Sequence, residues 1–164
     1  MGKHFPKTVH NDTYWPTENG WPMASNMFNQ DIYGPVFPTL PGAMPRITPG
    51  WNLRIVNDQG IECARNELGN VVLGLPLPPS HTMTIWGNDQ RYIDSYLKDL
   101  PGWYMIGDEG IIDERGYFHV KGGIDDVINV AGHRLDTGRI EEAINLHPSI
   151  SESVVIGVKD SIKG

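Results

Sequence analysis

The chain has 164 residues, of which 39% are hydrophobic, and this is enough for one folded domain with a buried core. Thirteen Lys and Arg stand against twenty Asp and Glu, a formal net charge of -7, so we do not expect a nucleic-acid partner. The single Cys63 excludes an internal disulfide and a multi-thiolate zinc site.

The N-terminal stretch MGKHFPKTVH has no apolar core of the kind found in secretory signals, and no apolar run reaches membrane-spanning length. We therefore expect a soluble, intracellular protein without a membrane span.

The stretch NDTYWPTENGW, residues 11–21, places two adjacent aromatic residues between carboxylates. This pattern fits an ordinary strand with one buried face. It also fits a binding strip, in which a ring faces a base, a hydroxyl faces a phosphate and a carboxylate holds a metal. The residues alone do not decide between these.

Regular structure is predicted mainly after residue 51. Residues 22–51 are rich in Pro and Gly, which predicts an extended loop. The runs NLRIV and NVVLGL predict strands, and a helix is expected from Asp89 to Leu100, started by Asn88 or Asp89. GWYMIGDEGIIDERGYFHVKGG predicts two or three strands, with DERG as a hairpin turn.

A second helix is expected to start near Asp136 or Thr137, because apolar residues then recur at i, i+3 and i+4 until Pro148. The run SVVIGV predicts a last strand. Because one helix and one strand cannot bury both faces alone, the C-terminal unit looks cut short.

Four stretches carry a resemblance to a known family: DTYWPTENG, GWYMIGDEG, DERGYFHVKGGIDDVINVAGHRL and IEEAINLHPSISESVVIGV. In this order and spacing they are similar to the motifs D-T-W-W-Q-T-E-T-G, Y-x-T-G-D and G-R-x-D-D-V-I-N-V-x-G-H-R and to the helix and strand that follow. These are motifs of the short-chain acyl-CoA synthetases, in the AMP-forming adenylating superfamily. The stretches LPLPP and GWP resemble the propionate-activating branch more than the acetate-activating one.

The resemblance implies an α+β fold in two parts. Residues 1–124 would be the C-terminal portion of the large AMP-binding domain, a β-rich, distorted β-barrel-like subdomain. Residues 125–164 would be the hinge and the truncated start of a small α+β domain. Since the similarity covers only the middle to late part of a family member, we expect a fragment, which lacks parts of its own parent chain.

The family joins a carboxylic acid to ATP, giving an acyl-adenylate and pyrophosphate, and the thiol of coenzyme A then attacks the activated carbonyl. The resemblance therefore implies a small carboxylic acid, ATP with Mg2+ and coenzyme A as partners, in the cytoplasm or the mitochondrial matrix. In-line attack on the α-phosphorus depends mainly on positioning and charge neutralisation.

Five residues receive individual roles at the nucleotide by this resemblance. Tyr14 would lie against the adenine, and Thr17 would hydrogen-bond the α-phosphate. Asp108 would accept from the ribose hydroxyls, Arg134 would face the phosphates, and Glu18 would hold the magnesium. The nucleotide-binding set as a whole would be Asp12, Thr13, Tyr14, Trp15, Pro16, Thr17, Asp108 and Arg134.

Other motif positions imply further sites. Trp15 would wall off the acyl pocket and exclude long chains. Ala131 and Gly132 would line the pantetheine path, and Asp125 would be the hinge between the two catalytic orientations. A second cation would bind carbonyls where the second helix ends. Those carbonyls belong to Asn145, His147 and Ile150.

Taken singly, each of these residues has a plainer interpretation. Buried aromatic residues are more often core than base-stacking, aspartates are usually turn or cap residues, and an arginine is more often on the surface. The joint order of the motifs is what favours the functional interpretation.

The departures from the family pattern suggest a weakened site. Pro16 stands in place of Gln, Ile106 in place of Thr, Arg139 in place of Glu, and Gly123 in place of an arginine that reaches the nucleotide. One lost charged hydrogen bond costs about 2 to 4 kcal/mol when it acts on the transition state. No phosphate-cradling loop with a lysine is present, and the family's catalytic lysine would lie beyond Gly164.

Three hypotheses remain open. The chain is a piece of an active short-chain acyl-CoA ligase, a non-catalytic nucleotide or coenzyme A binding module or decayed paralogue, or a structural remnant that pairs through exposed strand edges. A phosphate-binding loop and a lysine motif in the flanking coding sequence would favour the first. In each case we expect the isolated chain to be inactive.

Overall fold

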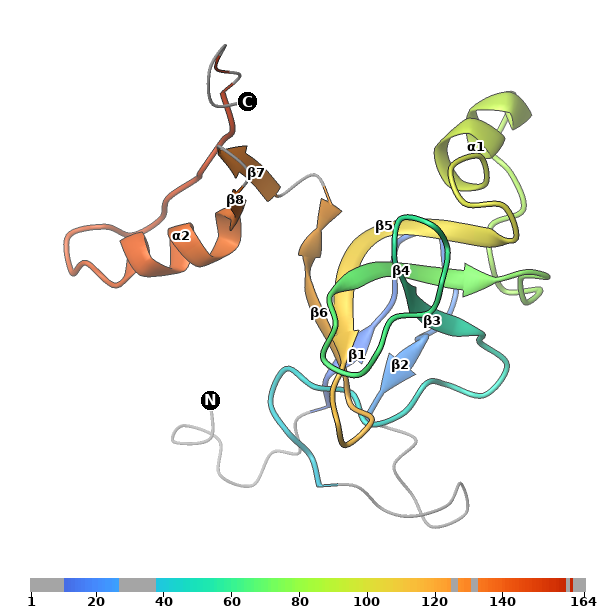
Figure 1. Cartoon of the computed structure of the whole chain (residues 1–164), viewed down its shortest axis with the longest axis horizontal. Coiled ribbons are helices and arrows are strands. Elements are labelled where there is room, and N and C mark those ends of the chain that lie inside the picture. The colour runs from blue at the N-terminus through green and yellow to red at the C-terminus, as the bar shows by residue number, and fades with distance from the viewer. Residues whose placement is uncertain (1–10, 27–37, 125–126, 131–132, 159, 161–164) are drawn as a thin grey trace.

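The computed structural model describes residues 11–26, 38–124, 127–130, 133–158 and 160 (Figure 1). The centre of this part of the chain is a four-stranded antiparallel sheet in the order β3-β4-β5-β6. Its strands are β3 Leu53–Val56, β4 Gly69–Gly74, β5 Trp103–Ile112 and β6 Phe118–Gly123. The predictions of strands at NLRIV and NVVLGL, and of two strands joined by the DERG turn, are confirmed.

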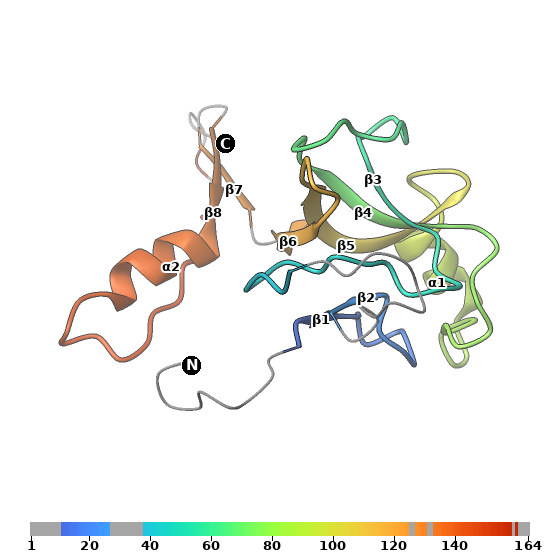
Figure 2. The same cartoon turned by 90° about the horizontal axis from the view of Figure 1, so that it is seen from below.

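A second, smaller layer lies against one face of this sheet (Figures 1 and 2). It is the antiparallel pair β1 Thr13–Tyr14 and β2 Ala24–Ser25. The Pro-rich segment 38–51 fastens this pair to the sheet through single bridges, of which Ala24 to Ile47 and Met44 to Phe118 are the key ones. Of the loop predicted at residues 22–51, the part 38–51 is an extended connection as its composition predicts. The prediction is wrong at Ala24 and Ser25, which form β2, and residues 27–37 lie outside the described residues.

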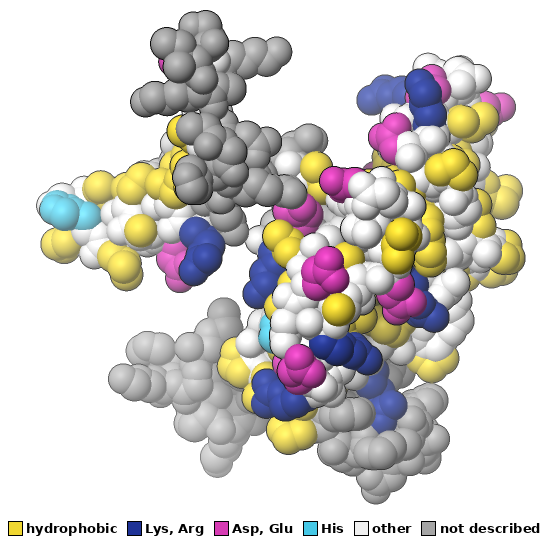
Figure 3. Space-filling view, in the orientation of Figure 1, with side chains coloured by type: hydrophobic (Ala, Val, Ile, Leu, Met, Phe, Trp, Pro, Cys, Tyr) yellow, Lys and Arg dark blue, Asp and Glu magenta, His cyan; other side chains and the backbone are white. Residues whose placement is uncertain are grey.

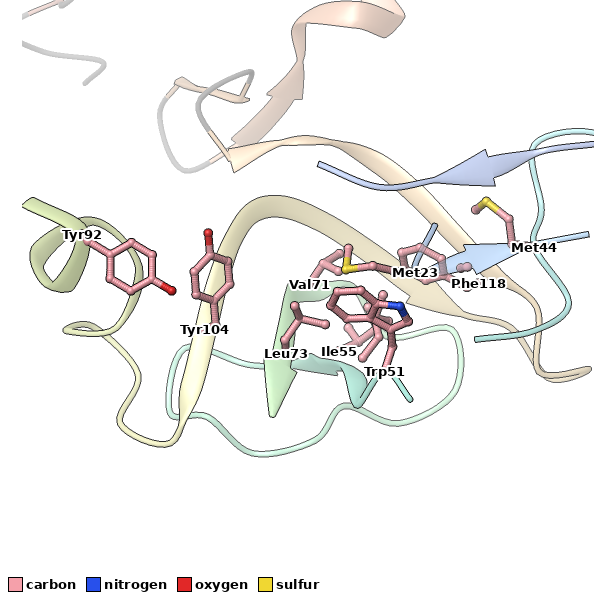
Figure 4. Packing of buried hydrophobic residues seen from close by; sticks show 11 residues of the cluster. Met23, Met44, Trp51, Ile55, Val71, Leu73, Tyr92, Tyr104 and Phe118 are labelled. Carbon is pink, nitrogen blue, oxygen red and sulfur yellow. The ribbon is translucent and has the colours of Figure 1, made fainter. Parts of the chain in front are cut away.

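The core fills the space between the two layers, and Figure 4 shows its packing. All six residues of β4 are buried, which explains why Val71, Val72 and Leu73 at its centre are apolar in succession, without polar alternation. The buried cluster consists of Met23, Ala24, Met44, Trp51, Leu53, Ile55, Val71, Leu73, Tyr92, Tyr104 and Phe118.

The first helix, α1 Asp89–Tyr96, packs at one end of the sheet. The side chain of Asn88 accepts from the backbone N–H of Arg91 at 3.0 Å, so the predicted start is confirmed as an N-cap. The predicted end at Leu100 is wrong. The chain leaves the helix at Leu97, and Leu100 is buried separately with Val56 and Val72 of the sheet, a contact it gains by turning out of the helical path.

The remaining elements form a C-terminal unit that stands apart from the sheet in both views (Figures 1 and 2). They are the antiparallel pair β7 Val127–Val130 and β8 His133–Asp136, followed by α2 Thr137–Asn145. The predicted start of the second helix at Thr137 is confirmed. The β7-β8 pair was not predicted as a separate hairpin.

The predicted last strand at SVVIGV is wrong. The backbone N–H of Val155 donates to the side chain of Glu141 at 2.8 Å, and Ser153 donates to the carbonyl of Glu141. The segment is thus tied to α2, and none of the described strands pairs with it. Val154, Ile156 and Val158 remain exposed, and Figure 3 shows apolar side chains along this unit.

The fold class is α+β, as predicted, but the sheet is open. The barrel-like closure that we expected is not found in the described residues, because β3 and β6 are the two edges and do not pair with each other. The β1-β2 layer covers one face in place of a closing strand. Among the described residues, no helix has both the length and the apolar character needed to cross a membrane.

Leu73 tests the core directly, since its side chain is only 1% exposed. Leu73→Ala should lower the free energy of unfolding by about 2 to 5 kcal/mol, because it leaves a cavity between the layers. Ile61→Ala is the matched control: its side chain is 63% exposed, and its effect should stay within about 0.5 kcal/mol. Urea unfolding measures both, and equal small losses would contradict this description of the core.

Candidate functional site

The most informative contact at the predicted site joins Tyr14 to Asp108. The Tyr14 hydroxyl donates to Oδ2 of Asp108 at 2.5 Å, across 94 positions of sequence. This is the length of a charge-assisted hydrogen bond to a carboxylate. The Tyr14 ring also packs on Phe118, with centroids 5.3 Å apart. Two residues that the motifs single out separately are therefore brought together by the fold.

Asp108 occupies an irregular part of β5. Ile106, Gly107 and Asp108 lie opposite the single residue Val71, because the register with β4 shifts there. Gly107 has a φ of 94°, a backbone torsion that glycine adopts without strain. Such bulges turn side chains away from the regular ladder and are frequent beside active sites. The bulge is what aims Asp108 at the β1-β2 layer.

The environment keeps Tyr14 protonated. Burial, the hydrogen bond to Asp108 and the negative charges of Asp108 and Glu18 raise the pKa of Tyr14 well above its usual value. A neutral phenol remains a donor. A carboxylate has about four acceptor positions, so Asp108 can accept from Tyr14 and from other hydroxyl groups at the same time.

Glu18 lies near this pair and is held by α1. Its Oε1 accepts from the hydroxyl of Tyr96 at 2.9 Å, and its charge acts on both Tyr14 and Tyr104. The stretch DTYWPTENG therefore has features of both a strand with one buried face and a binding strip. Tyr14 belongs to a short strand with a buried partner, and Glu18 presents a carboxylate close by.

The other residues of the predicted strip have structural partners or are exposed. Oδ2 of Asp12 accepts from the backbone of Gly42 at 3.2 Å, and the hydroxyl of Thr13 lies 3.2 Å from that of Ser25. The turn after the strand leaves Pro16 half-buried, Thr17 exposed and Trp15 51% exposed.

Of the four predicted residues between 125 and 134, the structure describes the backbone of Arg134 alone. Arg134 is placed by its backbone on β8, opposite Asn129, in the unit that stands apart (Figure 1). Asp125, Ala131 and Gly132 lie outside the described residues.

Three carbonyls were predicted to bind a cation at the end of the second helix. Asn145 is the last residue of α2, so the predicted position at the helix end is correct. The carbonyl of His147 already accepts from the N–H of Ile150 at 3.0 Å. A carbonyl can accept a second partner, and the cation site stays a prediction.

Sequence reasoning missed two aromatic residues beside Glu18. Tyr104 is fully buried and stacks on Tyr96, with centroids 4.9 Å apart and planes 11° apart. Burial, followed by the charge of Glu18, raises the pKa of Tyr104. The sequence did contain a signal for this contact, which is Tyr96 on the apolar side of α1. A tyrosine in that position, unlike a leucine, needs a hydrogen-bond partner for its hydroxyl.

A divalent cation fits this site only if a bound ligand provides some of the donor atoms. The described residues contain no group of three or more His, Cys, Asp or Glu side chains able to hold a metal. Mg2+ in nucleotide sites is usually bound by one or two carboxylates together with substrate phosphates and water. Glu18 provides one such carboxylate, so the donor set fits Mg2+ that arrives with a phosphate ligand.

The chain is similar to proteins of known activity. It is 44% identical over 156 residues to the propionate–CoA ligase of Escherichia coli, an alignment that covers 93% of this chain and 24% of the ligase. It is 37% identical over 153 residues to the human mitochondrial acyl-CoA synthetase short-chain family member 3, covering 93% of this chain and 22% of that protein.

A solved structure shares the fold. The ATP-bound RpMatB-BxBclM chimera aligns with a TM-score of 0.73 and 29% identity, over 98% of this chain and 30% of that one. No protein-family model matches the chain. The chain spans about a quarter of the length of the curated relatives it matches.

Tyr14→Phe tests whether the hydrogen bond to Asp108 links the two layers. Removing one hydroxyl should lower the free energy of unfolding by about 1.5 to 3 kcal/mol, the range for a bond to a charged acceptor. In a double-mutant cycle with Asp108→Ala, the two effects should be coupled by about 1 to 2 kcal/mol. Additive effects would contradict the contact, and the pair Tyr14→Phe with Glu62→Ala should be additive as a control.

Proposed function

Since the chain belongs to the short-chain acyl-CoA synthetase family, we propose that it forms the adenine and ribose side of the active site of an AMP-forming acid–thiol ligase. The full reaction converts a small carboxylic acid, ATP and coenzyme A to acyl-CoA, AMP and pyrophosphate. Propionate is the acid favoured by the LPLPP and GWP stretches, ahead of acetate. The hydrogen bond between Tyr14 and Asp108 is the observation that carries this proposal.

The pair provides two features that a nucleoside needs. Asp108 has acceptor capacity left for the two ribose hydroxyls, and Tyr14 holds that carboxylate in place while offering a ring beside it for the adenine. Tyr14 itself is fixed by its contact with Phe118. Binding a nucleoside would therefore require little reorganisation of these side chains, which favours affinity.

The phosphate side of the site depends on charge. Bound Mg2+ would neutralise the phosphate oxygens during attack on the α-phosphorus. Glu18 would hold that ion, Thr17 would donate to the α-phosphate, and Arg134 would approach the phosphates from the C-terminal unit. These assignments rest on the motif positions.

Three further assignments are proposals of the same kind. Trp15 is half exposed, and we propose it as the wall of the acyl pocket, with the facing wall contributed from elsewhere in the parent protein. Ala131 and Gly132 would line the path of coenzyme A, and Asp125 would be the hinge. Gly122, three residues before Asp125, has a φ of 146°, a torsion that residues other than glycine rarely adopt.

Two more proposals concern the helix end and the compartment. The carbonyls at the end of α2 would hold a structural cation. We propose the cytoplasm or the mitochondrial matrix as the compartment of the parent, since one relative is named as mitochondrial.

A second candidate is a non-catalytic nucleotide-binding module. The observation that favours it is Gly123, which lies directly opposite Asp108 in the β5-β6 register. The resemblance expects an arginine at this position, beside the ribose carboxylate. A chain that kept Asp108 and Arg134 but lost this cation would bind nucleotide or coenzyme A without activating an acid.

The isolated chain should bind AMP but should not form an acyl-adenylate, because the phosphate-cradling loop and the family's late lysine are not among its 164 residues. Calorimetric titration with AMP should give a weak binding signal that Asp108→Ala removes and the control Asp113→Ala retains. Pyrophosphate release from ATP with propionate should equal a blank without protein. AMP binding that survives Asp108→Ala would overturn the assigned nucleoside site.

Gly123→Arg in the complete parent enzyme should raise the rate of adenylation by roughly tenfold to a thousandfold, the range for one preorganised charged donor. The reason is the position of residue 123 across from Asp108, where a guanidinium can reach the nucleotide. Gly123→Ala is the control for backbone effects and should give no gain. An unchanged rate for a folded Gly123→Arg enzyme would mean that the missing arginine does not limit the site.

A further inference from the structure

Glu18 is fixed at its backbone by a neighbouring segment. Its carbonyl accepts from both the backbone N–H and the hydroxyl of Thr82, at 2.9 and 2.8 Å. Next to it, the N–H of Gly20 donates to the carbonyl of Ser80 at 3.1 Å. The position of the Glu18 main chain is therefore determined by residues more than sixty positions away in sequence.

The side chain of Glu18 is fixed by a different element. Tyr96, the last residue of α1, donates its hydroxyl to Oε1 of Glu18 at 2.9 Å. The ring of Tyr96 stacks on the fully buried Tyr104, and Tyr92 packs against it with centroids 5.5 Å apart. Because its ring is held on the core, the Tyr96 hydroxyl is presented from a nearly fixed point.

This arrangement leaves one oxygen of Glu18 for another task. Oε1 is taken by Tyr96, and none of the described residues donates a hydrogen bond to Oε2. A carboxylate that binds a metal through one oxygen is commonly oriented by a hydrogen bond to the other. The geometry of Glu18 is that of a ligand oriented before the metal arrives.

We propose that Tyr96 is a positioning residue for the reaction: it holds Glu18 so that Oε2 faces the magnesium of Mg2+·ATP. This rests on the proposed function, in which Glu18 is the magnesium ligand. It adds a role for α1, an element outside the motifs that carry the family resemblance. Tyr96 itself touches neither metal nor nucleotide in this arrangement.

A purely structural role for Tyr96 makes a different prediction. In that case its hydroxyl only satisfies a half-buried polar group, and its loss changes stability without changing metal binding. A measurement of metal affinity therefore distinguishes the positioning role of Tyr96 from a purely structural role. Mn2+ replaces Mg2+ in such sites and is detected through the relaxation of water protons.

The experiment measures the affinity of the 164-residue chain for Mn2+·ATP by water-proton relaxation enhancement. Tyr96→Phe keeps the ring stack on Tyr104 and removes only the hydroxyl. It should weaken the affinity about 10- to 100-fold, the usual effect of losing a hydrogen bond that orients a metal ligand. Glu18→Gln should weaken it at least as much. Tyr117→Phe is the matched control, since it loses a hydroxyl bonded to the carbonyl of Pro38, and its affinity should stay unchanged.

The outcomes separate the two claims. If Glu18→Gln weakens Mn2+·ATP binding and Tyr96→Phe does not, the positioning role is wrong and the proposed function stands. If Tyr117→Phe weakens binding as much as Tyr96→Phe, the loss reflects stability alone and the positioning role is again wrong. A wild-type chain that does not bind Mn2+·ATP, or a Glu18→Gln chain that binds it normally, would contradict the proposed metal site and the positioning role together.

Discussion

The hydrogen bond from Tyr14 to Asp108 is the contact on which the arrangement of this chain depends most. Strand β1 has two residues and, among the described strands, pairs with β2 alone, which segment 38–51 bridges to the sheet. Tyr14 adds a direct contact between β1 and the sheet, through its bond to Asp108 and its packing on Phe118. The same bond brings together the two motifs that the family resemblance assigns to a nucleoside, so the packing of the layers and the geometry of the site are one feature.

The second carboxylate depends on the core in a similar way. Glu18 is reached by Tyr96, Tyr96 stacks on Tyr104, and Tyr104 belongs to the buried cluster. Functional residues on loops are commonly positioned by a rigid scaffold in this way. In this chain Tyr14 holds the carboxylate of Asp108, and Tyr96, stacked on Tyr104, holds that of Glu18.

Local signals in the sequence predicted most of the helices and strands. The contacts between residues far apart in the sequence could not be predicted from it. The cap at Asn88, the DERG turn and the apolar run of β4 depend on neighbours in sequence, and each was predicted correctly. The end of α1 was not, because Leu100 leaves the helix to pack with Val56 and Val72. The run SVVIGV has the composition of a strand, but a strand also needs a partner, and this segment bonds to Glu141 of α2 instead. The motifs named Tyr14 and Asp108, whereas the bond between them and the role of Tyr96 required the tertiary structure.

A crystal structure of this chain with bound AMP tests the central claim most directly. The account predicts that both ribose hydroxyls donate to Asp108, that Tyr14 still donates to the same carboxylate, and that the adenine lies beside the Tyr14 ring. AMP bound elsewhere on the chain, or Tyr14 and Asp108 separated in the complex, would contradict the account.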